Sequence, residues 1–230
     1  MTTGQPIVIA TGNPHKVEEL RAILARHGIA VVGLSDLAGS FREPEEHGHT
    51  FLENATIKAR SYAAQSGRVC LADDSGLEID ALGGAPGVIS SHYSTGGRET
   101  GLDRAQRDAA NNRRVLADLE GVPVANRSAR FVCTMALAAP GGSLLATSRG
   151  TFEGRIGLPG DVPRGQHGFG YDPLFLLPEP DTRSSAELDP DEKNRRSHRG
   201  AAARAMAEEI RRLGLAGHDA AGQKPPPAPP

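Results

Sequence analysis

The chain has 230 residues, enough for one large domain or two small lobes that bury a substantial core. Its 26 Lys and Arg nearly balance its 28 Asp and Glu, and the formal net charge of −2 gives no global field that favours nucleic acid or a membrane surface. No apolar stretch approaches the roughly 20 residues of a membrane span, and residues 1–5 are too short and polar for a signal peptide. Cys70 and Cys133 stand in apolar runs without metal-ligand spacing, which indicates reduced core thiols and a cytoplasmic protein.

The first part of the chain predicts alternating strands and helices. Apolar runs indicate buried strands, while Asn13 and the capping box from Thr50 to Glu53 mark where helices begin. In chain order we expect a strand at 6–11, a helix to about 27, a strand at 29–33, a polar loop at 42–49 and a helix at 50–65.

A short apolar run at 69–72 then leads into Asp73-Asp74-Ser75-Gly76. These are common turn residues, so we expect the strand to end in a turn here, and the tetrapeptide alone leaves a plain turn and a functional site equally open. Successive strand side chains point to opposite faces, so Asp73 and Asp74 cannot do the same job. One can face a cleft and hold a cation, while the other orients its neighbours.

The second half predicts a polar helix, a long hairpin and a final helix. The expected elements are a short strand at 77–80, a loop at 82–87, a helix at 103–119, strands at 127–138 and 143–156, a loop at 157–170, a short strand at 175–177 and a helix from 197 to about 213. The Pro-rich stretch 216–230 is predicted to be a disordered tail, leaving one domain at 1–215. Early alternation followed by a hairpin favours an α/β protein with a mixed sheet.

The segment from Thr11 to Lys16 is a candidate anion site. A buried strand that turns through Gly12 into a helix start offers free N–H groups at a positive dipole end, and Lys16 adds a full charge. The segment matches neither the Walker A loop nor the Rossmann fingerprint. An ordinary capped helix is the alternative interpretation.

Two glutamates in the polar loop are candidate metal ligands. A Mg²⁺ site takes one or two carboxylates plus water and phosphate oxygens, and Glu46 or Glu45 could join Asp74 to supply that pair. Lys58, inside the following helix, is expected near the same phosphates. A solvated loop and a surface lysine are the plainer alternatives.

Two later clusters are candidates for binding a flat ligand. Glycines on both sides of Phe169 let the backbone approach while the ring stacks, and Asp172 could accept from ring N–H groups, although a tight turn with a core Phe is equally open. In the cationic run at 192–199, Ser197 caps a helix and puts His198 and Arg199 in its first turn. Cations there oppose the helix dipole, which suggests another use for them.

With these clusters in order, the chain resembles the inosine triphosphate pyrophosphatase family over about residues 7–213. The matching motifs are Ala-Thr-Gly-Asn with Lys16, Thr-Phe-Leu-Glu-Asn-Ala with Lys58, Leu-Ala-Asp-Asp-Ser-Gly-Leu, Ala-Leu-Gly-Gly-Ala-Pro-Gly-Val, Gly-Phe-Gly-Tyr-Asp-Pro and Ser-His-Arg-Gly. The resemblance implies an elongated mixed β-sheet flanked by helices, with two lobes and a nucleotide cleft between them. It also implies a homodimer that hydrolyses ITP, dITP and XTP to the monophosphate plus pyrophosphate with Mg²⁺.

The resemblance also implies roles for individual residues. Asp74 would be the catalytic acid–base and a metal ligand, with Glu46 or its neighbour Glu45 as the second ligand. Pro14 and His15 would contribute only through their backbone. The implied substrate-binding residues are Thr11, Gly12, Asn13, Pro14, His15, Lys16, Ser75, Phe169, Gly170, Tyr171, Asp172, Lys193, His198 and Arg199.

Three other functions compete with this interpretation. The first is a related pyrophosphatase that acts on modified pyrimidine nucleotides. The second is a phosphate-transfer enzyme of the haloacid dehalogenase type, which would need Asp-x-Asp where this chain has adjacent aspartates. The third is a nucleotide-binding module without catalysis. A panel of nucleotides with separate detection of pyrophosphate and orthophosphate separates these functions from the leading hypothesis.

Overall fold

The computed structural model describes residues 5–216, so the predicted disordered tail lies almost wholly outside the described residues. Its centre is a six-stranded sheet in the order β2-β1-β3-β4-β5-β6. The strands are β1 (Ile7–Ile9), β2 (Val31–Gly33), β3 (Cys70–Ile79), β4 (Ser128–Ala138), β5 (Leu144–Ile156) and β6 (Phe175–Leu176). The β1 strand runs parallel to β2 and β3, whereas β3, β4, β5 and β6 pair antiparallel, which confirms the predicted mixed sheet.

The helices begin where the capping residues predicted. Asn13, Thr50 and Ser197 each accept a backbone N–H of the helix that follows. The helices are α1 (Pro14–Ala25), α2 (Phe51–Ser66), α3 (Arg104–Asp118), α4 (Pro190–Arg196) and α5 (His198–Arg212), and a long 3₁₀ segment, η3, covers Gly87–Thr95. Within residues 5–216, no helix is both long and apolar enough to cross a membrane.

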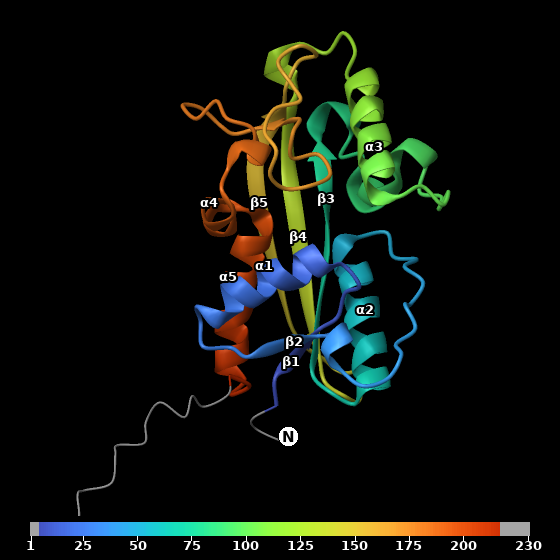
Figure 1. Ribbon diagram of the computed structural model, residues 1–230, viewed down its shortest axis with the longest axis vertical. Helices are drawn as coiled ribbons and strands as arrows, with labels where there is room; N and C mark the ends of the chain where they lie inside the picture. Colours follow the sequence, from blue (N-terminus) through green and yellow to red (C-terminus); the bar gives the residue numbers. More distant parts are fainter. Residues whose placement is uncertain (1–4, 217–230) are drawn as a thin grey trace, which may run out of the picture.

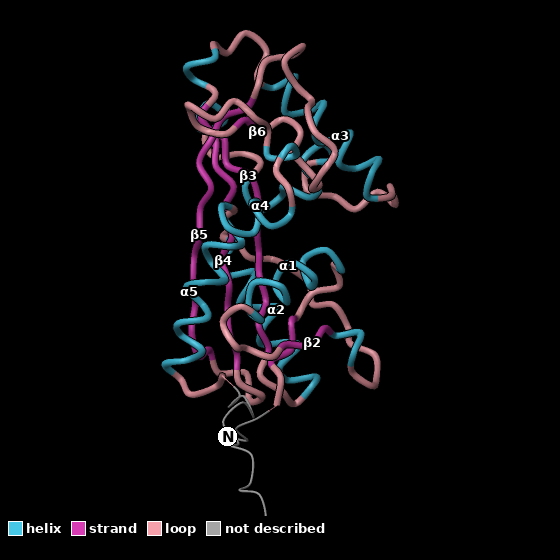
Figure 2. Tube along the Cα trace, turned by 60° about the vertical axis from the view of Figure 1, so that its left-hand side comes forward, coloured by secondary structure: helices cyan, strands magenta, loops and turns pink. Residues whose placement is uncertain are grey.

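The molecule is elongated along its three long strands, β3, β4 and β5, which run through two lobes (Figure 1). The lower lobe gathers β1, β2, α1, α2 and α5, and its core lies on both faces of the sheet. The upper lobe gathers α3, β6 and the glycine-rich loops around a separate cluster of buried apolar side chains. A second view shows the same division into two lobes along the strands (Figure 2).

The Asp73–Gly76 segment is not the predicted turn. The β3 strand continues through it to Ile79, and β4 pairs with every residue on the way, so the backbone groups of this polar stretch are satisfied by a ladder. The separate strand predicted at 77–80 is the second half of the same strand. Gly76 fits here because a Cβ would lie 2.6 Å from the carbonyl oxygen of Gly87.

The short β1 strand creates the place where functional groups gather. Its last paired residue is Ile9, opposite Leu71, and Ala10 still donates its N–H to the carbonyl of Leu71. Beyond that point β3 runs on without β1 beside it. The loop and helix that follow β1 therefore begin next to Asp73 and Asp74. Open α/β sheets commonly bind ligands outside the carboxyl ends of their parallel strands.

Candidate active site

Asp73 and Asp74 point to opposite faces of the sheet, as strand alternation predicted. The carboxylate of Asp73 faces α1 and α5, where the ammonium of Lys16 lies 2.9 Å away. The carboxylate of Asp74 faces α2 and accepts from the ammonium of Lys58 at 3.0 Å and from the amide of Asn54 at 3.4 Å. Two adjacent positions on β3 therefore carry two separate ion-pair systems, one on each face of the sheet.

Lys58 draws two carboxylates together on the α2 face. Its Nζ donates to Asp74 Oδ1 at 3.0 Å and to Glu46 Oε2 at 2.9 Å, and the lysine is only 8% exposed. Burial works to lower the pKa of Lys58, but attraction to Asp74 and Glu46 outweighs it and leaves that pKa above its ordinary value. Burial raises the pKa of Asp74 even though Lys58 opposes the rise. A carboxyl with a raised pKa is suited to proton transfer.

The two candidate glutamates have different surroundings. Both are exposed, but Glu46 shares Lys58 with Asp74, whereas Glu45 makes no hydrogen bond or ion pair with residues 5–216. The two carboxylates both bind the ammonium of Lys58, and one or two carboxylates are also the usual protein contribution to a Mg²⁺ site. Across those same residues, no three His, Cys, Asp or Glu side chains gather in a metal-ligating group. Asp74 and Glu46 could supply the one or two carboxylates that a Mg²⁺ ion takes from a protein.

Asp73 anchors cations on the other face. Its side chain has no exposed surface, and besides Lys16 it contacts Arg199 Nε at 3.4 Å and accepts from Ser75 Oγ at 2.8 Å. Burial works to raise the pKa of Asp73, but Lys16 and Arg199 outweigh it and hold that pKa far below its ordinary value. An Asp73 that stays ionised at neutral pH fixes the ammonium of Lys16 and the guanidinium of Arg199.

The helix start at α1 is partly used by its own cap. Asn13 Oδ1 accepts the N–H of His15 at 3.1 Å, and Pro14 has no N–H to offer. Thr11 Oγ1 accepts the N–H of Asn13 at 3.2 Å. The segment's clearest means of holding an anion is therefore Lys16, whose side chain stays 16% exposed beside Asp73.

The Phe169 ring is surrounded by cationic groups. Lys193 Nζ lies 5.4 Å from the ring centroid and the Arg199 guanidinium 5.8 Å, while the His15 ring is stacked at 6.4 Å. These side chains come from α4, α5 and α1, so elements far apart in the sequence meet at this ring. Such a set can stack on a flat base and donate to its edge.

Asp172 and Tyr171 hold the Phe169 loop in place. Asp172, 3% exposed, accepts from the N–H of Phe169 at 2.8 Å and from Lys193 Nζ at 2.5 Å. Tyr171, 5% exposed, donates its hydroxyl to the carbonyl of Ser90 at 2.6 Å. Gly168 has a φ of +81°, and a Cβ there would lie 2.6 Å from Lys193 Nζ. The structure therefore gives these two residues orienting contacts within the protein.

His198 is a buried neutral donor or acceptor beside Arg199. Its ring stacks on Phe131 at 5.0 Å between centroids, and its Nδ1 has no hydrogen-bond partner among the described residues. Burial, with the nearby charges of Arg199 and Lys193, lowers the pKa of His198 well below its ordinary value. The imidazole is therefore uncharged at neutral pH.

None of three residues near the site was singled out from the sequence, although Asn54 stands within the matching motif Thr-Phe-Leu-Glu-Asn-Ala. Asn54 and Glu19 lie on helices and contact Asp74 and Arg199, respectively. Arg104, the first residue of α3, has its guanidinium carbon 4.4 Å from the centroid of Phe169. The polar character of 103–119 predicted a helix, but only the fold shows which of its residues reaches the site.

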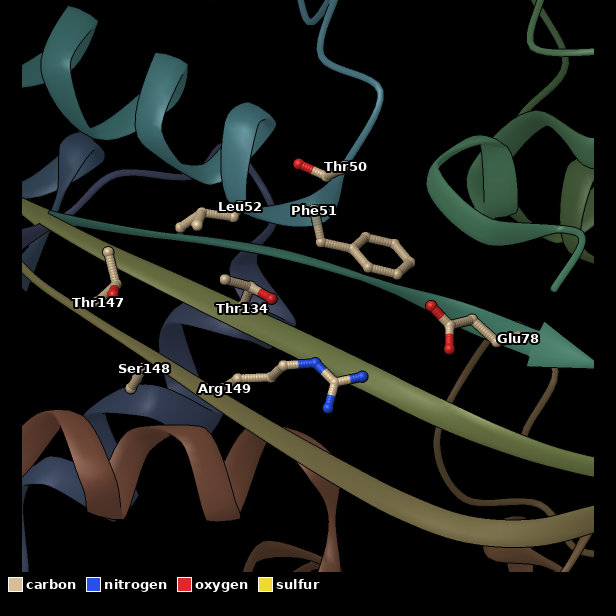
Figure 3. Close-up of a pocket in the computed structure, with 8 residues that line it drawn as sticks. All are labelled: Thr50, Phe51, Leu52, Glu78, Thr134, Thr147, Ser148 and Arg149. Carbon is tan, nitrogen blue, oxygen red and sulfur yellow. The ribbon is translucent and has the colours of Figure 1, made fainter.

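A pocket of about 410 Å³ opens on the Asp74 face of the sheet (Figure 3). Thr134, the register partner of Asp74, lines it, so the pocket begins one strand away from the Asp74–Lys58 pair. In Figure 3, Phe51 of α2 lies above the sheet, and Glu78 of β3 and Arg149 of β5 lie on the strands below it. The pocket residues are Thr50, Phe51, Leu52, Glu78, Thr134, Thr147, Ser148 and Arg149.

Comparison with known proteins identifies the family. The sequence profile of the Ham1 family matches residues 7–209. The chain belongs to the Ham1 family. As a family member it is 48% identical over 206 residues to the dITP/XTP pyrophosphatase of Nitratidesulfovibrio vulgaris, covering 90% of this chain and 96% of that protein. It is also 48% identical over 212 residues to the dITP/XTP pyrophosphatase of Pseudomonas aeruginosa, covering 92% of this chain and 98% of the relative.

Solved Ham1 structures share the architecture described above. The HAM1 protein from Coxiella burnetii matches with a TM-score of 0.75 and 40% identity, covering 90% of this chain and 98% of that one. The Ham1 protein of Staphylococcus aureus matches with a TM-score of 0.74 and 33% identity, covering 91% of this chain and 100% of that one. The predicted fold class, an elongated mixed sheet with flanking helices and two lobes, is confirmed.

Proposed function

We propose that this Ham1 family member hydrolyses ITP, dITP and XTP between the α- and β-phosphates, releasing the monophosphate and pyrophosphate. The observation that supports this proposal most directly is that β3 carries two ion-pair systems, one on each face of the sheet. Asp74, Lys58 and Glu46 lie on one face, and Asp73 and Lys16 on the other. The names of the relatives from N. vulgaris and P. aeruginosa support the substrate class.

The residues of the α2 face fit the hydrolytic step. Asp74 and Glu46 would hold Mg²⁺, which when bound neutralises phosphate charge and makes the α-phosphorus more electrophilic. Asp74 would accept the proton of the attacking water, a role that suits its raised pKa. Lys58 remains protonated and orients both carboxylates. Lys16 would stabilise the charge that develops on the departing pyrophosphate.

The cationic groups around Phe169 fit selection of a 6-oxopurine. The ring would stack on the base while Arg199, Lys193 or the imidazole of His198 donates toward the 6-oxo group. A 6-amino group would meet those donors with its own N–H groups and leave buried donors unpaired. Mismatches of this kind reduce turnover by up to about 10⁴-fold.

Assembly and location belong to the same proposal. We infer a homodimer in the cytoplasm that needs neither nucleic acid nor a membrane, which accords with the near-neutral charge and the family resemblance. The pyrimidine-specific pyrophosphatase and the non-catalytic module remain the competing functions, and the nucleotide panel below distinguishes them.

The decisive experiment measures ITP, dITP, XTP, ATP and dTTP turnover with separate detection of pyrophosphate and orthophosphate, with and without Mg²⁺. We expect fast release of pyrophosphate from the 6-oxopurines and little from ATP or dTTP. Asp74→Asn should keep ITP binding and lose most turnover. Asp161→Asn should match the wild type, because this exposed carboxylate makes no hydrogen bond or ion pair within residues 5–216. Preference for dTTP, or orthophosphate as the first product, would contradict the proposal.

A further inference from the structure

Arg104 contacts both the proposed base site at Phe169 and the proposed phosphate site at the start of α1, yet the proposed mechanism assigns it no role. Its guanidinium carbon lies over the Phe169 ring at 4.4 Å from the centroid, closer than Lys193 or Arg199. Its Nη1 donates to Asn13 Oδ1 at 3.1 Å. One side chain of the upper lobe therefore contacts the aromatic ring and also reaches the start of α1 in the lower lobe.

The same face of α3 also holds the backbone beside that ring. Asp108 Oδ2 accepts the N–H of Gly170 at 2.9 Å, and Asn112 Nδ2 donates to the carbonyl of Gly170 at 3.1 Å. Arg104, Asp108 and Asn112 are spaced four residues apart, which places them in one row along the helix. Arg104 therefore fixes the ring of Phe169, while the other two side chains of this row fix the backbone at Gly170, the residue after it.

We propose that Arg104 is a positioning residue for the purine base, an inference that rests on the proposed function in which Phe169 stacks on that base. A guanidinium over one face of an aromatic ring is attracted by the ring quadrupole and fixes the ring plane. The opposite face of Phe169 then receives the base. Asn13 orients the guanidinium, so the ring is already aligned before the nucleotide arrives, and less ordering is needed on binding.

A direct role on the triphosphate is the competing use of this cation. The position of Arg104 favours the base because the guanidinium is engaged with the ring and with an uncharged amide oxygen, and Asp108 Oδ2 lies 3.9 Å from its Nε. Inorganic tripolyphosphate separates the two roles, since it offers the phosphates without a base. Arg104 is 35% exposed at the first helical position, so substitutions there should leave the fold intact, and circular dichroism would verify it.

The test compares Arg104→Met and Arg104→Lys with Arg113→Met, which changes an exposed arginine on the same helix. For ITP we expect Arg104→Met to raise KM about tenfold with kcat within about threefold, because one ring contact and one charged hydrogen bond are lost. Arg104→Lys should give a KM between those of the wild type and Arg104→Met, since lysine keeps the charge but not the planar guanidinium. Arg113→Met should match the wild type, and the inhibition constant of tripolyphosphate should stay within about twofold in all variants. An unchanged KM, or an equal loss for tripolyphosphate, would overturn the inference.

A double-mutant cycle with Phe169→Leu checks that Arg104 acts through the ring. On the Phe169→Leu background, Arg104→Met should change KM by less than about twofold, and a full tenfold effect there would overturn the inference. If Phe169→Leu raises KM but Arg104→Met does not, only this inference fails. If the wild type does not release pyrophosphate from ITP, or Phe169→Leu leaves KM unchanged, the proposed function or its base site fails first and the inference falls with it.

Discussion

Adjacent aspartates on β3 have opposite pKa shifts, and the reason lies in which cations each face provides. Asp73 meets Lys16 and Arg199 and stays ionised far below its ordinary pKa. Asp74 faces α2, where burial outweighs a single close lysine and raises its pKa. Strand alternation predicts the division of faces, but the partners come from α1, α2 and α5, and only the fold brings those together.

The two glutamates before α2 should differ sharply in their effect on catalysis. Glu46→Gln removes a charged partner of Lys58, and we expect kcat/KM for ITP to fall about 10–100-fold, with a higher Mg²⁺ requirement. Glu45→Gln is the matched control and should stay within about twofold, because Glu45, unlike Glu46, makes no ion pair within residues 5–216. Steady-state rates across a Mg²⁺ titration give the result. The reverse order of effects would assign the second ligand to Glu45.

The buried imidazole of His198 should make folding stability depend on pH. Its folded-state pKa lies well below the ordinary 6.5 because of burial and the charges of Arg199 and Lys193, which outweigh Asp73. Below pH 6.5 the unfolded chain therefore binds more protons, and stability falls as the pH is lowered. Between pH 7.5 and pH 5.5, we expect the free energy of unfolding to fall by about 1.4 kcal/mol less in His198→Asn than in the wild type. Urea midpoints at both pH values test this, and parallel losses would show that His198 is not the group responsible.

At the scale of elements, local capping chemistry was a better guide than turn composition. Asn13, Thr50 and Ser197 predicted three helix starts correctly, because a cap is a contact within a few residues. Asp73–Gly76 has turn composition but forms the middle of β3, since β4 supplies a ladder partner for each residue. That partner lies about 60 residues later in the chain, so no local pattern could reveal it.

Arg127 should be a major stabiliser of the upper lobe. This arginine is 2% exposed and donates to the carbonyls of Leu119, Val122 and Gly157, tying the end of α3 to the start of β4 and the end of β5. Arg127→Met would leave those acceptors unpaired and should lower the free energy of unfolding by about 3–5 kcal/mol. Arg127→Lys keeps one donor group, so its free energy of unfolding should fall less than that of Arg127→Met. Chemical denaturation measures both, and a loss below about 1 kcal/mol in the Met variant would mean that water replaces the arginine.

For the whole molecule, the site depends on how two lobes meet on shared strands. The sequence motifs identified most groups that gather there, since Lys16, Asp74, Phe169 and Arg199 all converge near the middle of the sheet. Arg104 was not identified, because nothing in a polar helix reveals which of its side chains bridges to Asn13. Contacts between lobes are set by the fold, and short patterns carry no information about them.

Continuity of β3, β4 and β5 through both lobes predicts that the lobes unfold together. Every residue of β3 from Cys70 to Ile79 has a register partner on β4, so opening the upper half exposes the end of the lower core. Native-state hydrogen exchange should therefore give the 70–72 and 77–79 segments opening free energies within about 1 kcal/mol of each other. Peptides from 135–138 and 129–132 of β4 provide the matching control on the partner strand. If the 77–79 segment opened at least about 2 kcal/mol more easily, the upper lobe would be an independent unit hinged on the lower one, and the alignment of Phe169 with Lys16 would have to form on nucleotide binding.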